Sequence, residues 1–410
     1  MNILLIAYCI GAGRGSEPGV GWNVARGLAL QGHQITVIST NKYRDENQKS
    51  IEKEGLSIKL ITQDFPESCW TRSYKIWQRR IGPVIQQEIQ EQQYDVIHHI
   101  TFNQYRAIRD VFYTSLPALI GPIGGAEIVP LPLLCYGSLP ISYKIKEALR
   151  YLPWDAIPFI RRVNKAKQPV EIICSNQITE KRLHKGLFRV KTNICTAAAI
   201  CIHSSEICET SSPSKENPYI LFDGGLSRPQ KGTWLMIGAL NQLWTQNCHI
   251  PVCIVGLTDN EKSIIRRKAT QMGLPEEALR LYSSVPRSQM LELMRHATVM
   301  LSTVYRDSGA MALLEALAQG TRIVCLDIPS QLWLTPEMAC KVPVQRSRSK
   351  MEGALSDALK HQINAPAPDS TWHNKRVKFL QEHMTWESRI NMFVDKYKAL
   401  VSANTQTTNK

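Results

Sequence analysis

The sequence predicts an α/β protein built from two doubly wound, Rossmann-like domains in tandem. Short apolar runs alternate with longer amphipathic stretches, which is typical of parallel strands joined by crossover helices. This series occurs twice, on either side of a segment without apolar periodicity. The chain has 410 residues, and single hydrophobic cores stop growing near ~250 residues, so two cores are expected.

The first domain is expected to span residues 1–204. Its predicted strands are 3–8, 34–39, 57–61, 95–99, 118–121, 171–174 and 191–195, and its predicted helices are 21–31 and 74–91. Residues 205–218 are rich in Ser, Glu, Pro and Thr and are interpreted as the linker.

The second domain is expected to span residues 219–385. Its predicted strands are 219–223, 251–255, 299–302 and 322–327, and its predicted helices are 232–244, 260–272, 289–295 and 309–319. A further amphipathic helix, 386–400, is expected to pack back toward the first domain. The polar residues 401–410 are predicted to be a disordered tail.

Charge is the unusual feature of the composition. The chain carries 49 Lys and Arg residues against 35 Asp and Glu residues, a net charge of +14. Such an excess is compatible with nucleic acid, an anionic membrane or a phosphorylated substrate as partner. Its 11 cysteines include no CxxC pair, which favours free thiols in the cytoplasm and neither a metal site nor a disulfide framework.

A glycine-rich turn follows the first strand and includes Gly13, Gly15 and Gly21. Glycines between a strand and a helix let backbone N–H groups approach an anion. A dinucleotide fingerprint would need glycine in place of Ser16 and an acidic residue after the second strand, which ends in Ser39-Thr40. A bound NAD is therefore not expected, and neither is another cofactor; a turn without any ligand remains the alternative.

Two segments of the second domain follow strands and carry charge. Arg228 and Lys231 lie beside glycines, where a guanidinium and an ammonium can hold a diphosphate; a solvated basic loop is the alternative. Asp307 precedes the predicted helix 309–319, and Glu315 lies within that helix. Asp307 can instead be a helix cap, and Glu315 can bind sugar hydroxyls or be an exposed carboxylate.

The end of the strand 95–99 carries His98 and His99, and the next strand is followed by Gly124, Gly125 and Glu127. Successive strand residues point to opposite faces, so only one of the histidines can face a cleft on a given side. A histidine at a strand end is more often structural than catalytic, but Gly-Gly and Glu on the neighbouring strand favour a site.

Together these motifs make the chain resemble the family 4, or group 1, retaining glycosyltransferases of the GT-B fold, most closely the exopolysaccharide-biosynthesis branch. The likeness runs from residue 2 to about residue 400. Its most specific feature is the pattern of Asp307, seven residues and Glu315, followed by Ala-Leu-Ala-Gln-Gly320. Such enzymes move a sugar from a nucleotide sugar to an acceptor without a bound metal.

The resemblance implies a role for each motif. Glu315 would hold the nucleotide ribose, and Arg228 and Lys231 would neutralise the diphosphate. The catalytic residues would be His99, Lys231 and Asp307, and the donor sugar and phosphates would meet the backbone of Ser308, Gly309, Ala310 and Met311. Gly13 and Gly15 would close over the diphosphate, and Gly124, Gly125 and Glu127 would lie on the acceptor side.

The chain departs from the family pattern at three places. Asp307 stands where Glu is common, and the usual Gly-Arg-Leu reads Gly224-Gly225-Leu226, which displaces the arginine to Arg228. Residues 329–331 are Pro-Ser-Gln where the branch has Gly-Gly-Pro. A non-catalytic GT-B scaffold of a polysaccharide assembly complex is therefore kept as an alternative, beside a sugar-nucleotide epimerase.

The basic excess is concentrated between residues 144 and 191, which hold twelve Lys and Arg residues against four acidic ones. Aromatic and aliphatic residues from Tyr143 to Phe159 are interleaved with these charges, as in segments that bind anionic lipid. No aromatic run typical of nucleic-acid recognition is present. The charge therefore predicts a location peripheral to the inner face of the cell membrane, with a solvated basic face as the alternative. The resemblance implies a hexosyltransferase with a glycan or polyprenyl-linked acceptor.

Overall fold

The computed structural model describes residues 1–64, 70–136, 139–184, 189–211, 213–214 and 216–408. They form two compact units. The first comprises Met1–Glu127, Leu152–Cys201 and His383–Lys410, and the second comprises Ile128–Tyr151 and Ile202–Glu382. Cys69, one of the 11 cysteines, and Lys185, one of the basic residues between 144 and 191, lie outside the described residues.

The first unit contains a sheet of seven parallel strands in the order β3-β2-β1-β4-β5-β6-β7. Their bounds are β1 Asn2–Ala7, β2 Gln34–Thr40, β3 Ile58–Gln63, β4 Val96–Thr101, β5 Ala118–Ile123, β6 Val170–Cys174 and β7 Asn193–Thr196. All seven predicted strands are confirmed. The strand order reverses between β1 and β4, which is where ligands bind in doubly wound sheets, beyond the carboxyl ends of the strands.

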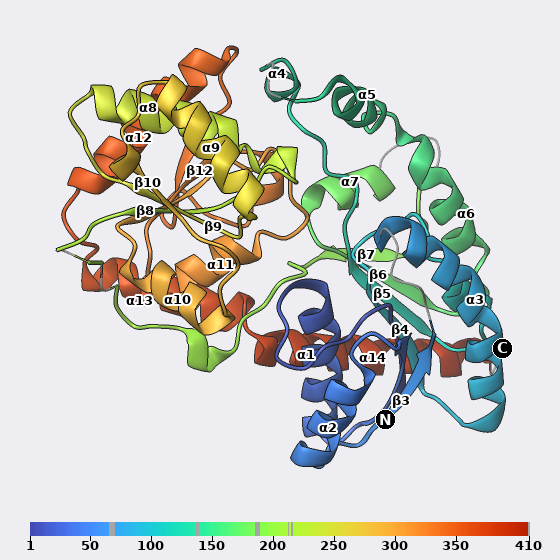
Figure 1. Cartoon of the computed structure of the whole chain (residues 1–410). Helices are drawn as coiled ribbons and strands as arrows, with labels where there is room; N and C mark the ends of the chain where they lie inside the picture. The colour runs from blue at the N-terminus through green and yellow to red at the C-terminus, as the bar shows by residue number, and fades with distance from the viewer. Residues whose placement is uncertain (65–69, 137–138, 185–188, 212, 215, 409–410) are drawn as a thin grey trace. The chain divides into compact units, whose positions relative to one another are not determined.

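Helices cover both faces of this sheet (Figure 1). Trp77 of α3 and Phe159 of α6 belong to the core on one face, while Leu28 of α1 and Phe393 of α14 belong to the core on the other. The helices of the unit are α1 Ser16–Leu30, α2 Arg44–Glu54, α3 Trp70–Glu91, α6 Ile157–Lys165, α7 Gln177–His184 and α14 Trp386–Thr408. Of these, α2, α6 and α7 were not predicted.

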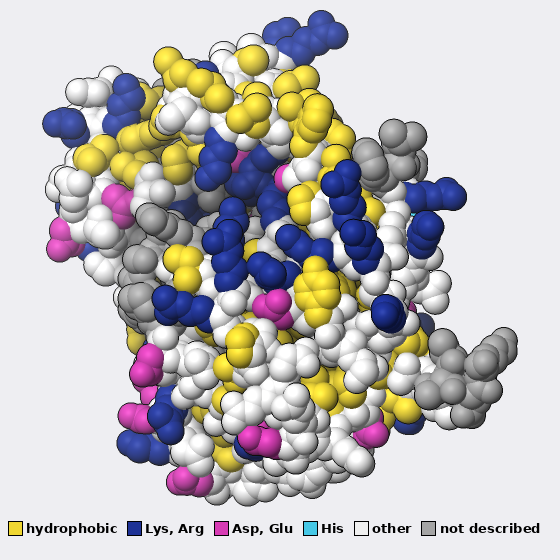
Figure 2. Space-filling view, turned by 90° about the vertical axis from the view of Figure 1, so that its right-hand side faces the viewer, with side chains coloured by type: hydrophobic (Ala, Val, Ile, Leu, Met, Phe, Trp, Pro, Cys, Tyr) yellow, Lys and Arg dark blue, Asp and Glu magenta, His cyan; other side chains and the backbone are white. Residues whose placement is uncertain are grey.

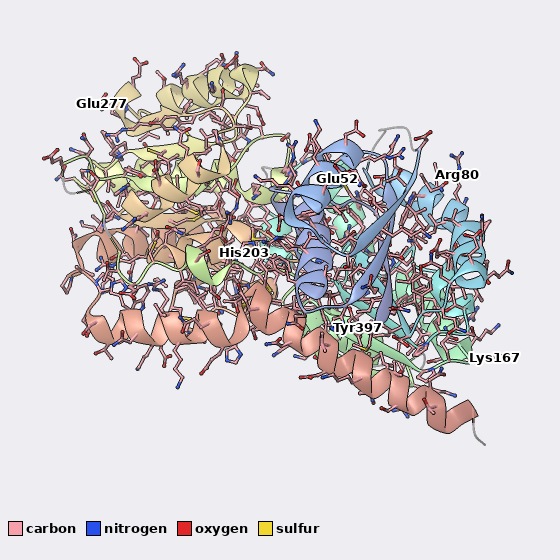
Figure 3. The ribbon with its side chains drawn as sticks, turned by 90° about the horizontal axis from the view of Figure 1, so that it is seen from below. Glu52, Arg80, Lys167, His203, Glu277 and Tyr397 are labelled. Carbon is pink, nitrogen blue, oxygen red and sulfur yellow. The ribbon has the colours of Figure 1, made fainter. Side chains whose placement is uncertain are left out.

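The last helix, α14, packs against α1 and lies in the first unit. Its Tyr397, labelled in Figure 3, places its hydroxyl 2.5 Å from Nδ1 of His98 in β4. The prediction of a disordered tail from residue 401 is wrong for residues 401–408, because α14 continues to Thr408. No Gly or Pro interrupts that stretch, and backbone hydrogen bonding can therefore continue.

The second unit contains six parallel strands in the order β10-β9-β8-β11-β12-β13. Their bounds are β8 Ile220–Asp223, β9 Val252–Val255, β10 Leu279–Leu281, β11 Val299–Ser302, β12 Ile323–Asp327 and β13 Cys340–Pro343. The four predicted strands are confirmed, and the two edge strands β10 and β13 were missed. Here the strand order reverses between β8 and β11.

The main helices of the second unit are α8 Thr233–Thr245, α9 Asp259–Gln271, α10 Arg287–His296, α11 Met311–Ala318, α12 Arg348–Asn364 and α13 Ser370–His383. The sequence predicted the first four and missed α12 and α13. Helix α12 packs closely on α8, and its Met351 and Leu355 are fully buried in the core of the unit.

The segment Ile128–Tyr151 lies in the second unit, although the predicted boundary placed it in the first domain. It carries α4 Leu131–Leu134 and α5 Ile141–Leu149. Val129 and Leu133 are fully buried in the same core as the strands of the second sheet. Burial of these apolar side chains holds the segment in the second unit, and the local sequence pattern does not indicate which core they join.

The predicted linker is attached to the second unit wherever the structure describes it. The amide of Cys208 donates to the carbonyl of Ala318 at 2.9 Å, and the amide of Ser214 donates to the carbonyl of His296 at 2.9 Å. Residues 212 and 215 lie outside the described part. Among the helices that the structure describes, none is long and apolar enough to cross a membrane.

Candidate functional site

The loop between β8 and α8 lies at the strand-order reversal of the second sheet and carries Lys231. Its ammonium forms an ion pair with Asp223, the last residue of β8, with Nζ and Oδ2 2.6 Å apart. Gly232 adopts φ +71°, and a Cβ there would lie 2.3 Å from the carbonyl oxygen of Thr303. Only glycine therefore allows the loop to approach the end of β11 so closely.

Arg228, on the same loop, is exposed and makes no ion pair with any residue that the structure describes. The loop below it is braced by Glu261 of α9, whose Oε1 accepts hydrogen bonds from the amides of Leu226 and Ser227 at 2.6 and 2.9 Å. Backbone hydrogen bonds, the one from Thr258 first, lower the pKa of Glu261 to about 2. The carboxylate stays ionised, so the brace persists at neutral pH.

The segment after β11 leads into α11. One carboxylate oxygen of Asp307 accepts a hydrogen bond from the amide of Gly309 at 3.1 Å. The N-cap of α11 is Ala310, however, so neither Asp307 nor Ser308 occupies that position. Ala310 is buried, while the neighbouring predicted donor contacts Ser308, Gly309 and Met311 keep part of their surface exposed.

Glu315 of α11 is the partly buried carboxylate of this group, with 12% of its side chain exposed. The packed stripe predicted beside it, Leu313, Leu314 and Leu317, is buried. Arg287, the first residue of α10, donates to Glu315 Oε1 from Nε at 3.1 Å and also pairs with Glu206. Burial raises the pKa of Glu315, and the positive charge of Arg287 opposes that rise.

Sequence reasoning missed Glu261 and Arg287, because each reaches its partner from another part of the chain. Arg287 opens α10 directly after a proline, a signal that marks a helix start but does not reveal what the side chain binds. Within the second unit, Lys231, Asp223 and Glu315 are brought together, since the charge of Asp223 contributes to the raised pKa of Glu315.

In the first unit, the glycine-rich turn leads from β1 into α1, whose N-cap is Gly15. Asn47 of α2 holds the turn, accepting from the amide of Ala12 at 2.9 Å and donating to the carbonyl of Ile10 at 3.0 Å. A Cβ at Gly13 or Gly15 would meet no atom of the described chain within 4 Å. Packing thus leaves these two glycines open to an approaching molecule.

His98 and His99 are both fully buried, on opposite faces of the first sheet. His99 lies 2.9 Å through Nε2 from the hydroxyl of Tyr74, and burial lowers its pKa to about 3. The imidazole is therefore neutral and closed off from solvent, because helices cover both faces of the sheet. His99 was predicted to be catalytic; in the structure its ring is enclosed and contacts Tyr74.

Gly124, Gly125 and Glu127 follow β5. Glu127 is buried, and it accepts from the amide of Gly125 at 2.9 Å and from Nδ2 of Asn176 at 2.6 Å. Gly125 adopts φ +111°, and its carbonyl accepts from the guanidinium of Arg106. Glu127 therefore shapes the Gly-Gly turn from inside, and the turn itself is what can meet a ligand.

Glu17, in the first turn of α1, is a further carboxylate at this end of the first sheet. It accepts a hydrogen bond from the amide of Asn103 at 2.8 Å. The side chain keeps some exposed surface, whereas the carboxyl group itself is enclosed, and burial raises its pKa to about 7. No sequence motif pointed to Glu17, since its environment is created by the segment that follows β4.

Each unit thus gathers its candidate residues at the carboxyl ends of its own strands. The groups in the second unit suit an anionic, hydroxyl-rich ligand: two cations on one loop, and a carboxylate oriented by an arginine. Among the described residues, no group of three or more His, Cys, Asp or Glu side chains is placed to hold a metal ion.

Residues 205–333 match the family model described as Glycosyl transferases group 1. No curated protein sequence matches the chain. Among solved structures, a glycosyltransferase from Rickettsia africae is similar with a TM-score of 0.69 and 14% identity, over 98% of each chain. WaaG, a glycosyltransferase involved in lipopolysaccharide biosynthesis, has a TM-score of 0.61 and 14% identity, covering 96% of this chain and 99% of that one.

A third similar structure, described as trehalose-6-phosphate from E. coli, is bound with UDP-2-fluoro glucose. Its TM-score is 0.64 at 10% identity, and the match covers 97% of this chain and 99% of that one. The solved structures share the GT-B fold predicted for this chain. The group 1 match, which covers β8 to β12, supports a glycosyltransferase domain in the second unit.

Proposed function

We propose that the chain is a retaining hexosyltransferase of family 4, which moves a sugar from a nucleotide sugar to a glycan or polyprenyl-linked glycan acceptor. The observation that carries the proposal is the loop of Arg228 and Lys231 at the strand-order reversal of the second sheet, near the carboxylate Glu315. Cations placed there meet the diphosphate of a donor whose ribose hydroxyls hydrogen-bond to Glu315.

Charge develops on the diphosphate as the glycosidic bond breaks, and fixed cations stabilise that charge in the transition state. Lys231 is already oriented by Asp223, and Arg228 stands on a loop braced by Glu261. We infer that these two side chains perform the neutralisation without a metal ion. Asp307 and the backbone of Ser308 to Met311 would then receive the sugar.

We infer that the first unit contributes the glycines. Gly13 and Gly15 have the open space that a diphosphate approaching their backbone would need. The turn of Gly124 and Gly125 would line the acceptor side, with Glu127 holding its shape from beneath. His99 is assigned to positioning in this scheme, because its ring is buried and hydrogen-bonded to Tyr74.

We further propose a role in exopolysaccharide or other cell-surface polysaccharide synthesis, at the inner face of the cell membrane. Its support is the basic stretch 144–191, most of whose described Lys and Arg residues are exposed at least in part, and the ten described cysteines, which are all free. The solved relative involved in lipopolysaccharide biosynthesis is compatible with an acceptor of this kind.

The direct test is a panel of UDP-, GDP- and ADP-sugars offered with lipid-linked glycan acceptors, with and without EDTA. We expect one donor class to be bound and transferred, with the anomeric configuration retained in the product by NMR. Loss of transfer in EDTA would contradict metal independence, and an inverted product would contradict retention. Conversion of the donor sugar without an acceptor would replace the proposal with an epimerase.

A further inference from the structure

Helix α5 presents a row of aliphatic side chains to solvent. Ile141, Ile145 and Leu149 are 75%, 58% and 62% exposed. They are four residues apart, and residues at that spacing lie one above the other on a single helix face. Large apolar side chains exposed singly are ordinary, but three in a row on one short helix form a continuous apolar ridge.

The opposite side of α5 is fixed to the second unit. Glu147 is fully buried and forms two hydrogen bonds with the guanidinium of Arg306, at 2.8 and 3.0 Å. Tyr143 packs, partly buried, against the hydrophobic core of the same unit. Because a buried charge pair and an aromatic ring hold this side, α5 cannot roll over to bury the ridge.

Positive charge accompanies the ridge. Lys144 and Lys146 lie on α5, and neither forms an ion pair with any residue that the structure describes. Leu131 of the preceding α4 is a further exposed aliphatic side chain, at 60%. Exposed hydrophobic side chains gather in the upper part of the face shown in Figure 2, together with Lys and Arg side chains.

We propose that the ridge of Ile141, Ile145 and Leu149 inserts into the headgroup region of an anionic bilayer, with Lys144 and Lys146 meeting the lipid phosphates. Short amphipathic helices bind membranes in this way, through buried apolar area and attraction to anionic lipid. The inference rests on the proposed function, which places the acceptor at the membrane, and names the surface that brings the second unit to it.

A lipid surface fits these observations better than a protein partner. A standard protein interface buries roughly 800 Å² on each side, and three side chains on a nine-residue helix supply only part of that area. Unpaired lysines beside an apolar ridge complement anionic headgroups directly. A second copy of the chain would bring the same lysines against each other.

Co-sedimentation with vesicles of phosphatidylcholine, with and without phosphatidylglycerol, tests the proposal. We expect the full chain to bind the anionic vesicles, and the double variant Ile145→Ser/Leu149→Ser to lose about tenfold or more in partition coefficient, because two aliphatic side chains no longer leave water. The matched control is Leu30→Ser/Tyr113→Ser, which removes two side chains of similar exposure, 58% and 60%, from the first unit.

A second variant is Lys144→Gln/Lys146→Gln. Its partition coefficient for vesicles with phosphatidylglycerol should be about as low as its partition coefficient for vesicles of phosphatidylcholine alone. Equal losses in the ridge variant and its control, or unchanged binding in the ridge variant, would overturn the proposal. A dimer in light scattering that the ridge variant abolishes would also overturn it, in favour of a second copy on this face.

The same variants separate this inference from the proposed function. Transfer to a water-soluble acceptor fragment should be retained by Ile145→Ser/Leu149→Ser, since no residue of the candidate site is changed. If the protein binds anionic vesicles through the ridge but transfers no sugar, the proposed function is refuted and the membrane surface stands. If the protein transfers sugar but does not bind anionic vesicles, membrane binding by the ridge is refuted and the proposed function stands.

Discussion

Glu147 and Arg306 form a bidentate ion pair across 159 residues of sequence, with oxygen to nitrogen distances of 2.8 and 3.0 Å. Glu147 has no exposed surface, and the side chain of Arg306 is 18% exposed. Arg306 directly precedes Asp307 of the candidate donor site. The pair thus joins the helix with the apolar ridge to the segment that leads into α11.

Removing one charge of this pair should destabilise the second unit. In Glu147→Gln the guanidinium of Arg306 loses its carboxylate in a mostly buried position, and such losses cost about 3 kcal/mol. Denaturant unfolding measures the change. Glu46→Gln is the control, because its partner Arg14 is half exposed and ion pairs exposed to solvent contribute little to stability. Equal unfolding midpoints in both variants would contradict this assignment.

Lys231→Ala should abolish most transfer without unfolding the protein. Removing one fixed donor to a developing charge lowers kcat by about 100-fold or more. Steady-state kinetics with the identified donor measures the loss, and thermal unfolding checks the fold. Lys350→Ala removes an exposed lysine from α12 of the same unit and should leave kcat unchanged. A Lys231→Ala variant with wild-type kcat would remove Lys231 from the site.

Affinity for the donor should weaken as the pH falls, and Arg287 should determine the pH at which this loss begins. Burial raises the pKa of Glu315, and the charge of Arg287 holds it down. In the proposed role the ionised carboxylate accepts from the ribose hydroxyls, so affinity should be present above that pKa and lost as pH falls through it. In Arg287→Gln the pKa should rise further, moving the loss to higher pH.

Calorimetric titration of the donor across pH detects this shift. Glu315→Gln is the reference, since it has no ionisable group at that position. Its affinity for the donor should be weaker and should not fall further with decreasing pH over this range. An Arg287→Gln profile that coincides with the wild type would show that the guanidinium does not act through Glu315.

Glu17 should make the folded protein less stable as pH rises toward neutrality. Its pKa is raised from 4.5 to about 7, so the folded state retains a proton that the unfolded chain releases between those values. The stabilisation is full below about pH 4.5 and declines to zero near pH 7, by up to about 3 kcal/mol. Urea unfolding of wild type and Glu17→Gln across this range isolates the contribution. Parallel stability curves would contradict it.

The strands and the charged loops were predictable because their signals are local. Most of the predicted strands are short runs dominated by apolar residues, and Lys231 and Glu315 stand at recognisable distances from the strands before them. The edge strands β10 and β13 read Leu-Arg-Leu and Cys-Lys-Val-Pro, so a charged residue interrupts each apolar run. Glu261 and Arg287 escaped because their partners are 35 and 28 residues away.

His99 shows where alternation along a strand stops being informative. The pattern places His98 and His99 on opposite faces, and it cannot tell that helices cover both faces. A sheet covered on one side would have exposed one ring. Here Tyr74 from α3 and Tyr397 from α14 each form a hydrogen bond with a histidine, and both rings are fully buried.

By itself, the sequence determined two doubly wound sheets, the loops at their strand-order reversals and the residue types that suit a nucleotide sugar. All three features follow from local signals, namely hydrophobic periodicity and the placement of glycines, which involve residues close together in the sequence. Only the tertiary structure decided which unit holds α5 and which of its faces is exposed. Burying Glu147 against Arg306 turns Ile141, Ile145 and Leu149 to solvent, and that orientation depends on a partner 159 residues away.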